Sequence, residues 1–528
     1  MARDRSEAEA RIRRGLRVAL RGRRDPAPVA GQRSRNAGDV DDLHTRKVLD
    51  LTIRLAEVML SSGSGTADIV ATAQDVAEAY QLNDCVVDIT FTTIIVSALP
   101  TADSPPVTIV RTVRNRATDY TRLAELDRLV RDITTGGVAV EQAHEAMDEL
   151  TRRPHPYPRW LATAGWAGFA LGIALLLGGS WVTCVLAAVT SAAIDRVGRV
   201  LNRMGTPFFF QNVVGAAIAT LVAVAAYLFA GQGVTALVAT GIVMLLSGLT
   251  LVGSMQDALT GHMITAVGRL SDALFMTAGI VVGIVAGLQI ATVAGVEIVL
   301  HIDATESFVI PNQPLPIALA VGGATLAGAC LTVACYAPLR TVAPAGLAAG
   351  LAEAVLIGLG LAGFGTTVAA GIAAVGAGLF ATMISIRRQA PALVISTAGI
   401  TPMLPGLAVF RAVFYFAVDD QFDDGLAQLL TAGATALALG AGVVMGELLS
   451  SPLRYRAGRI GDFCRIEGPP GLRRAVGRVV HLRPTATAKP TGRQRSRSVA
   501  LGPARGVDET HDGSDAEPEG EQHADGAR

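Results

Sequence analysis

The chain has few charged residues and few aromatic ones. Of its 528 residues 17% are charged and 5% are aromatic, whereas 51% are hydrophobic, and the mean hydropathy is +0.43. Soluble domains typically contain about 25% charged residues, so this composition excludes an ordinary soluble enzyme of such length. Ala and Gly predominate, which favours helices that pack closely in lipid. We therefore predict a polytopic α-helical membrane protein with soluble ends.

Motifs of metal, nucleotide and catalytic sites are lacking as well. The five cysteines form no CxxC pair and no Cys/His cluster, so they predict neither a disulfide framework nor a metal site. The chain has no phosphate-binding loop of the form GxxxxGK followed by Ser or Thr, and no Ser/His/Asp arrangement can be recognised. The chain is therefore predicted not to be an enzyme, to need no cofactor and to bind no nucleic acid.

Charge gathers at the two ends of the chain. Residues 1–35 contain eleven arginines and four acids, and residues 507–528 contain eight acids and one arginine. Because the end segments 1–43 and 451–528 are polar and aperiodic, we expect disordered cytoplasmic tails. Attraction of the basic tail to anionic lipid is the alternative. No apolar stretch of signal-peptide length follows the first arginines, so we expect the chain to begin in the cytoplasm.

Residues 44–152 predict a small cytoplasmic α+β domain, because apolar residues recur at helical spacing and β-branched residues mark strands. The expected helices are at about 48–60, 66–80, 120–133 and 140–150, and the expected strands at 86–96 and 107–113. The sequence Gly63-Ser64-Gly65-Thr66 resembles an anion-binding turn, with a plain turn and helix cap as the alternative. Asp68 suits the dipole of the helix that follows.

From residue 160 the chain becomes apolar, in segments that mostly reach the length of about 20 residues needed to cross a bilayer. We predict ten spans, in the halves 160–296 and 315–450: 160–178, 181–195, 208–230, 233–253, 272–296, 315–337, 341–362, 366–386, 391–418 and 425–449. Lys and Arg occur only in alternate connecting loops, which places both termini in the cytoplasm of a multi-pass protein in the cell membrane. Because each half has five spans, related halves would be inverted, an architecture common among transporters.

The fourth and ninth segments predict a substrate-binding site. Ser247 and Thr250 of the fourth belong to a small-Gly-aliphatic-Thr pattern that recurs in the ninth, where it ends at Thr401. Three further residues of the ninth segment, Pro402, Pro405 and Gly406, should break that helix. A helix end freed within a membrane points N–H groups at an anion such as a carboxylate. A purely structural kink is the alternative.

Ionisable residues within spans are candidates for binding. Arg411 could pair with a substrate carboxylate, or else reach the outer interface or pair with Asp419. Glu353 could bind a proton or a substrate amine, or else form an interhelical hydrogen bond. Asp257 is equally well explained as a helix cap or as a partner of Arg269.

Six stretches of the chain resemble the threonine/serine exporter family, in its single-chain actinobacterial form. They are SSGSGTADIVAT, VDITFTTIIVS, DYTRLAELDRLVRDI, PHPYPRW, QDALTGHMITAVGRLSDALFMTAGI and GITPMLPGLAVFR, and together they span roughly residues 45–450. The resemblance implies a cytoplasmic domain, ten helices, and secondary export of threonine and serine driven by the proton motive force.

The resemblance also implies the partners of the chain. They are an amino-acid substrate, protons as the coupling ion and a surrounding bilayer, and a homo-oligomer is compatible with it. A dicarboxylate exporter of the succinate type is the alternative, because some relatives are linked to that activity. A membrane-anchored hydrolase is a weaker one, because it would need a nucleophile and a base that the sequence does not offer.

Overall fold

The computed structural model describes residues 38–82, 84–99, 105–113, 119–230, 234–296, 313–388, 391–416 and 422–457. All of these residues fall within one compact unit of the chain, Met1–His481. The first described helix, α2 (Gly38–Ser61), begins inside the segment predicted as a tail, and the last, α17 (Phe422–Ala457), continues beyond residue 450. The remainder of the two predicted tails lies outside the described residues.

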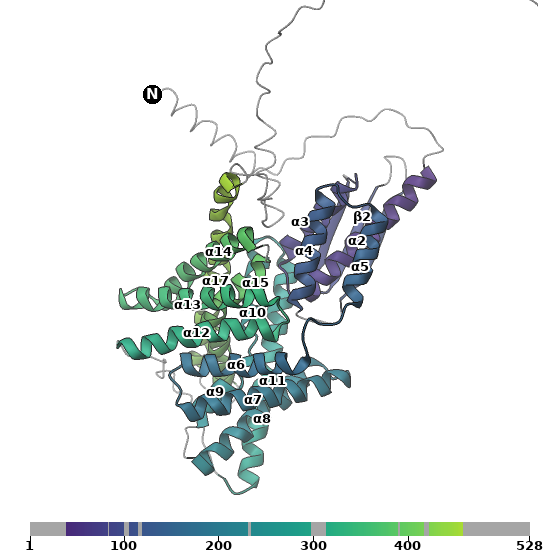
Figure 1. Cartoon of the computed structure of the whole chain (residues 1–528). Helices are drawn as coiled ribbons and strands as arrows, with labels where there is room; N and C mark the ends of the chain where they lie inside the picture. The colour runs from purple at the N-terminus through teal and green to yellow at the C-terminus, as the bar shows by residue number, and fades with distance from the viewer. Residues whose placement is uncertain are drawn as a thin grey trace, which may run out of the picture. The chain divides into compact units, whose positions relative to one another are not determined.

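The N-terminal domain is an α+β structure, as predicted, with helices packed on a three-stranded antiparallel sheet (Figure 1). After α2 its elements are α3 (Thr66–Ala79), β1 (Cys85–Thr90), β2 (Thr93–Ala98), β3 (Val107–Thr112), α4 (Tyr120–Thr134) and α5 (Val140–Arg152). In the sheet order β1-β2-β3, Val87 pairs with Val96 and Ile95 with Val110. Asp119 caps α4, because its side chain accepts hydrogen bonds from the N–H groups of the first turn.

The single strand predicted at residues 86–96 is wrong, because β1 and β2 form a hairpin over this stretch. The chain reverses at Phe91 and Thr92, and Phe91 adopts a left-handed backbone conformation with φ of 54°. Such turns usually contain Gly, Asn or Asp, so nothing local in the sequence indicates this one. The turn is instead held by contacts with a distant helix, which are described below.

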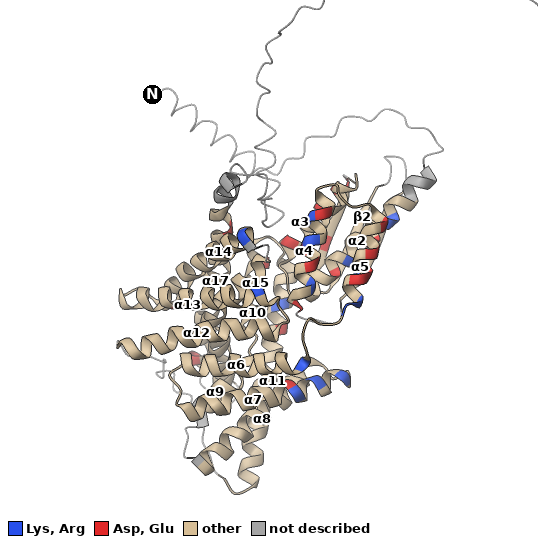
Figure 2. Cartoon of the chain, in the orientation of Figure 1, with Lys and Arg blue, Asp and Glu red and all other residues tan. Residues whose placement is uncertain are grey.

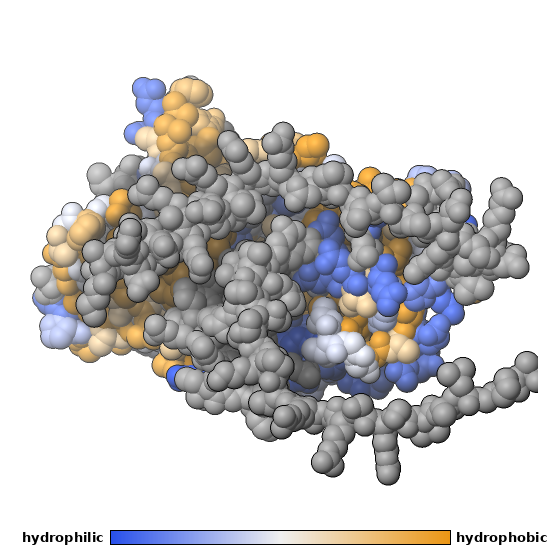
Figure 3. All heavy atoms as spheres, turned by 90° about the horizontal axis from the view of Figure 1, so that it is seen from above, coloured by the Kyte–Doolittle hydropathy of each residue, from blue (hydrophilic) through white to orange (hydrophobic). Residues whose placement is uncertain are grey.

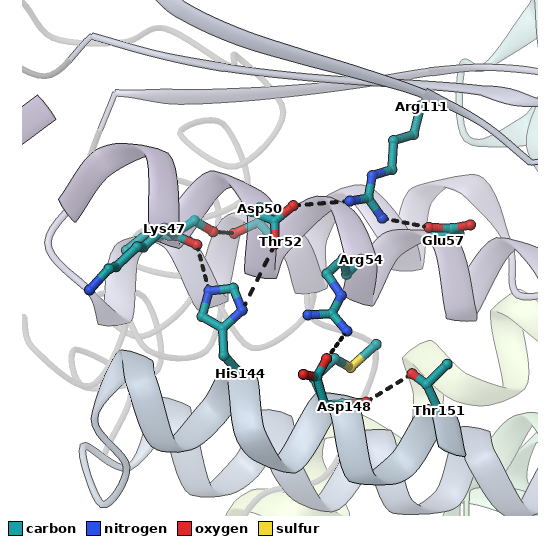
Figure 4. A network of polar contacts seen from close by, with 11 residues as sticks. Lys47, Asp50, Thr52, Arg54, Glu57, Arg111, His144, Asp148 and Thr151 are labelled. Atoms are coloured by element: carbon teal, nitrogen blue, oxygen red, sulfur yellow. Dashed lines mark hydrogen bonds and ion pairs between the residues drawn. The ribbon is translucent and has the colours of Figure 1, made fainter. Parts of the chain in front are cut away.

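A network of ion pairs fastens the sheet and α5 to α2 (Figure 4). Arg111 of β3 lies 3.0 Å from both Asp50 and Glu57 of α2. On the other side, Arg54 of α2 forms an ion pair with Asp148 of α5. These side chains are partly exposed, so each pair contributes little on its own. The apolar core beneath them, which includes the fully buried Leu51 and Leu55, supplies most of the stability.

The rest of the described chain is helical. Its elements are α6 (Arg159–Leu176), α7 (Trp181–Arg203), α8 (Phe208–Ala230), α9 (Val234–Gly241), η1 (Val243–Leu245), α10 (Gly248–Leu259), α11 (Met263–Val293), α12 (Pro314–Ala334), α13 (Leu339–Leu361), α14 (Thr366–Arg388), α15 (Ala392–Ile400), η2 (Thr401–Met403), α16 (Gly406–Phe414) and α17. The fifth predicted span therefore begins earlier than residue 272, at Met263.

Seven of the described helices are long and apolar enough to span a membrane, namely α6, α8, α11, α12, α13, α14 and α17. An eighth span results if α15–η2 and α16, which are bent by 46°, count as one. Large apolar side chains stay exposed on these helices, such as Phe229 and Val293, which suits contact with lipid. The chain is thus a multi-pass membrane protein.

Among the described residues, charged side chains lie mainly on the N-terminal domain, whereas α6, α12 and α13 carry almost none (Figure 2). Seen from above, hydrophilic side chains are most frequent on the right of the view, with hydrophobic ones between them, and hydrophobic side chains predominate on the left (Figure 3). Glycines allow the apolar helices to approach one another closely. A β-carbon at Gly165 or Gly172 of α6 would lie under 3 Å from the backbone of α12, which is the close packing expected of membrane helices.

Candidate functional site

The fourth and ninth predicted spans are both broken, and the two breaks have the same backbone shape. In each, a 3₁₀ turn (η1 or η2) ends at an extended leucine, and a new helix begins two residues later. Leu246 has φ −65° and ψ 132°, and Leu404 has φ −62° and ψ 133°. The residues that follow also agree: Ser247 has φ −83° and ψ 22°, and Pro405 has φ −79° and ψ 22°. The break predicted in the ninth span is confirmed, and the break in the fourth was not predicted.

The two breaks cross each other, with a glycine from each at the crossing point. A β-carbon at Gly248 would lie 2.9 Å from Cβ of Leu404, and one at Gly406 would lie 2.9 Å from Cβ of Leu246. Real β-carbons do not come this close, so only glycine allows the chains to cross here. The contact is reciprocal, as expected for two elements related by local two-fold symmetry.

The predicted alignment of these two segments is wrong in register. It paired Ser247 with Ala398, whereas the backbone dihedral angles pair Ser247 with Pro405. The correct register could have been found, because Gly-Ile-x-x-x-Leu-x-Gly-Leu occurs at both 241–249 and 399–407. The small-Gly-aliphatic-Thr pattern was therefore coincidental, although the segments that it linked are the right ones.

A cavity of about 650 Å³ lies beside the breaks, between the N-terminal domain and the membrane helices. One residue of each break, Leu246 and Ile400, reaches it, and α10, α11, α15 and α17 supply most of the remaining membrane side. Of the predicted site residues, only Thr250 and Asp257 line it. Its polar side chains are Ser61, Ser62, Asp68, Thr92, Tyr120, Thr250, Gln256, Asp257, Thr260, Arg269, Ser396, Thr397 and Glu447.

The N-terminal end of α10 faces this cavity, because Leu249 and Thr250 of its first turn line it. The first N–H groups of a helix have no partner within the helix and carry partial positive charge. The Thr250 hydroxyl makes no hydrogen bond with any residue that the structure describes. This end of α10 thus offers donors for an anion and a free hydroxyl.

Asp257, near the other end of α10, ties the N-terminal domain to the membrane helices. Its Oδ1 accepts a hydrogen bond of 2.9 Å from the backbone N–H of Thr66, and its Oδ2 lies 3.1 Å from Nη1 of Arg269. Arg269 Nη2 donates in turn to the carbonyl of Ser64 at 3.1 Å. The turn at Gly63 to Thr66 therefore does bind an anion, but the anion is a carboxylate of the same chain.

The β1–β2 turn makes the second part of this contact. The Phe91 N–H donates to Oγ1 of Thr265 on α11 (3.0 Å), and that hydroxyl donates to the carbonyl of Ile89 (2.9 Å). The Phe91 ring covers Gly268, where a β-carbon would lie 2.8 Å from it. We call these interactions of the domain with α10 and α11 the α3 contact. They explain why Phe91 holds a strained conformation, since the surrounding structure fixes it.

A separate contact, which we call the α4 contact, joins the domain to the loop between α12 and α13. The N–H of Tyr120 donates to the carbonyl of Cys335 (3.0 Å), and the Tyr157 hydroxyl donates to the carbonyl of Ala337 (2.6 Å). Between these carbonyls Tyr336 adopts a left-handed conformation with φ of 56°, and its ring stacks on Tyr157. The domain thus contacts both halves of the membrane region.

Asp68 brings a second carboxylate to the cavity, from the first turn of α3. It is partly buried and makes no hydrogen bond or ion pair with any described residue. Burial, and then the neighbouring charge of Asp257, raise the pKa of Asp68 from 3.8 to about 6. The sequence predicts for Asp68 only a role at the helix dipole, because the approach of Asp68 to Asp257 cannot be read from local sequence.

The remaining predicted site residues do not line the cavity. Ser247 Oγ donates to the carbonyl of Ala273 on α11 (3.0 Å), and Thr401 Oγ1 donates back to the carbonyl of Thr397 (2.7 Å), so both hydroxyls are engaged within the protein. Pro402 lies in η2, and Pro405 and Gly406 lie at the start of α16.

Arg411 and Glu353 are both placed within apolar helices. Arg411 is partly buried in the last turn of α16, and Asp419, which was considered as its partner, lies outside the described residues. Glu353 of α13 is 4% exposed, and its Oε2 has no hydrogen-bond partner among the described residues. A buried carboxylate with an unsatisfied oxygen is costly, so Glu353 stays a candidate for binding a proton or an amine. In the described part of the chain, no three His, Cys, Asp or Glu side chains are grouped so that they could hold a metal ion.

Comparison with known proteins identifies the family. Residues 50–291 match the family described as "Putative threonine/serine exporter", and residues 321–449 match "Threonine/Serine exporter, ThrE". The chain is 74% identical over 510 residues to a "Probable threonine/serine exporter" of Mycobacterium tuberculosis, covering 96% of each chain. It is 38% identical over 413 residues to the "Threonine/serine exporter" of Corynebacterium glutamicum, covering 77% of this chain and 83% of the relative. No solved structure matches the chain significantly. The matched ranges and identities show that this chain belongs to the threonine/serine exporter family.

Proposed function

We propose that this chain exports threonine and serine across the cell membrane as a secondary transporter and has no enzymatic activity. The proposal rests on the names of two relatives that align over most of their length. It is supported by a polar cavity at two crossing helix breaks, since broken helices are where transporters bind substrates. The cavity is lined by hydroxyl groups, which suit a hydroxylated amino acid.

We further propose ten spans in two inverted halves, with both termini in the cytoplasm. In this reading α7 and α9–η1–α10 also cross the membrane, which gives five spans from α6 to α11 and five from α12 to α17. Equivalent helices pack alike: α8 on α11 corresponds to α14 on α17, and α10 on α17 corresponds to α16 on α11. Cysteines introduced at 305 and 421 should then label from outside, whereas native Cys464 should not. Labelling of Cys464 in intact cells would contradict this topology.

In the proposed mechanism the cavity is the cytoplasmic vestibule. The first turn of α10 binds the substrate carboxylate, with Thr250 near the substrate hydroxyl, and Asp257 holds the domain in place. The equivalent end of α16 does not reach the cavity and would serve the outward-facing state, in which Arg411 could take part. In alternating access the first turn of α10 is open to the cytoplasm in one state, and the first turn of α16 is open to the outside in the other, as inverted halves allow.

The N-terminal domain gates the vestibule in this proposal. Its two contacts fall on different halves, the α3 contact on α10 and α11 and the α4 contact on the α12–α13 loop. A domain fastened to both halves holds them in one arrangement until a contact opens. Protons are the proposed coupling ion, with Glu353 as the group that binds them, because its buried Oε2 lacks a partner.

The charge of the cavity argues against the dicarboxylate alternative. Three carboxylates line it, those of Asp68, Asp257 and Glu447, against the single guanidinium of Arg269. A dianion would be repelled, whereas a zwitterion carries a cationic group that such a lining attracts.

Proteoliposomes containing the full chain test the proposed function. They are loaded with labelled threonine, serine or succinate, and efflux is followed with and without a membrane potential and proton gradient. Threonine and serine should leave, an uncoupler should slow them, and ATP should have no effect. Efflux of succinate alone, or ATP-dependent efflux that resists uncouplers, would contradict the proposal.

A further inference from the structure

Asp68 is a cavity-lining acid that the fold does not explain. It stands in the first turn of α3, where a carboxylate can stabilise the helix dipole. That end of α3 already receives the Asp257 carboxylate, whose Oδ1 accepts from the Thr66 N–H. A second anion so close is repelled by the first, and the domain would be more stable without it.

The charges around Asp68 leave it uncompensated. Arg269 is already engaged by the Asp257 carboxylate at 3.1 Å and by the Ser64 carbonyl. The other ionisable groups that line the cavity are Glu447, which adds negative charge, and Tyr120, whose pKa is raised by burial so that it stays neutral. An ionised Asp68 therefore lines the cavity beside the carboxylate of Asp257, and no described cation pairs with it.

We propose that Asp68 binds the α-ammonium group of the exported amino acid, so that the substrate site is shared between the N-terminal domain and the membrane helices. This inference rests on the proposed function. Asp68 and the first turn of α10 line the same cavity, so a zwitterion finds an anion for its ammonium and N–H donors for its carboxylate. The domain is thus part of the binding site as well as its gate.

The test uses full-length protein in proteoliposomes and compares Asp68→Asn with wild type and with Asp68→Glu. Asp132→Asn is the matched control, because it makes the same change at an exposed position of α4 outside the cavity. Transport of labelled threonine is measured with the competitor on the cytoplasmic side of the protein. The two competitors are 3-hydroxybutyrate, which lacks the ammonium group, and threoninol, which lacks the carboxylate.

We expect Asp68→Asn to raise the KM for threonine by about ten- to a hundred-fold, the worth of a charged hydrogen bond. Competition by threoninol should weaken to a similar degree. The weak competition by 3-hydroxybutyrate should stay unchanged, because this compound has no ammonium group to bind Asp68. Asp68→Glu should recover part of the affinity, and Asp132→Asn should behave as wild type.

Other outcomes overturn the inference. An unchanged KM in Asp68→Asn, or equal loss of all three compounds, would mean that Asp68 does not contact the ammonium group. Thermal unfolding of each variant in detergent shows whether it is folded, and Asp68→Glu keeps the test decisive if the Asn variant is not. Failure of wild type to transport threonine or serine would refute the proposed function instead, whatever the variants do.

Discussion

The two halves of the membrane region reach the same broken backbone by different chemistry. In the second half Pro402 and Pro405 remove N–H donors and so interrupt the helix. In the first half the break at 241–249 contains no proline, and the Ser247 hydroxyl instead hydrogen-bonds to the carbonyl of Ala273 and the hydroxyl of Thr277 on α11. The helix that follows the proline-free break, α10, lines the cavity with its first turn, whereas α16, which follows the proline-containing break, does not line it. What the site requires is therefore a backbone shape with glycine at the crossing, and proline is only one way to obtain it.

Locking the domain to one half should have the largest effect on export. The β-carbons of Phe91→Cys and Gly268→Cys would lie 3.2 Å apart, close to disulfide range. In a variant without native cysteines, oxidation should stop threonine efflux from proteoliposomes almost completely, and reduction should restore it. Each single cysteine is the control. Full export by the cross-linked protein would show that export does not require the α3 contact to open.

Glycine at the crossing should be needed equally in both halves. Gly248→Ala and Gly406→Ala each place a β-carbon 2.9 Å from a leucine β-carbon, which should cost about 1–3 kcal/mol of stability and remove most export. Gly433→Ala on α17 is the control, because a β-carbon there meets nothing within 4 Å. Efflux assays and thermal unfolding would measure both effects. A large difference in export or in stability between Gly248→Ala and Gly406→Ala would contradict the equivalence of the two halves.

Removing the prolines should have a moderate effect. Pro402→Ala combined with Pro405→Ala restores the missing hydrogen-bond donors, so the protein should insert normally while export falls by about ten-fold, since a helix end is worth up to about 2 kcal/mol to an anion. Ser247→Ala should do less, because glycine still permits the break in the first half. Arg411→Lys should also reduce export if the guanidinium binds a carboxylate through two hydrogen bonds. Normal export by all these variants at matched expression would mean that the breaks are purely structural.

The smallest expected effect is a pH-dependent difference in stability between wild type and Asp68→Asn. The pKa of Asp68 is raised from 3.8 to about 6 by burial and by Asp257, so the folded protein binds the proton more tightly than the unfolded chain. Wild-type stability therefore falls as the pH rises through this range and stays reduced above it. Asp68→Asn has no such titration and does not lose this stability. The Tm of the variant minus that of the wild type should therefore increase by roughly 2–4 °C from low to neutral pH. A constant Tm difference across that range would contradict the raised pKa.

Sequence alone predicted where most helices of both regions lie, because apolar periodicity and hydropathy are local signals, although seven or eight of the described helices qualify as spans where ten were predicted. The break at Pro402 and Pro405 was predictable for the same reason. The break at Ser247 contains no proline, so its only sequence signal is the Gly-Ile-x-x-x-Leu-x-Gly-Leu pattern that it shares with 399–407, and its hydrogen bond to another helix cannot be read from local sequence. The reversal at Phe91 was hidden likewise, since Thr265, far along the chain, holds it in place. The grouping of Asp68, Asp257 and Arg269 depends on how the domain docks, which no local pattern encodes.

The short connection between α5 and α6 sets the range over which the domain can act. Only residues 153–158 separate α5 from α6, and six extended residues span at most about 20 Å. A domain on so short a tether has an effective concentration near its docking surface in the millimolar range or above. Contacts that would be too weak to hold a separate protein can therefore hold this one, and each can open alone and close again quickly. The same domain supplied as an independent polypeptide would have to reach millimolar levels to replace it.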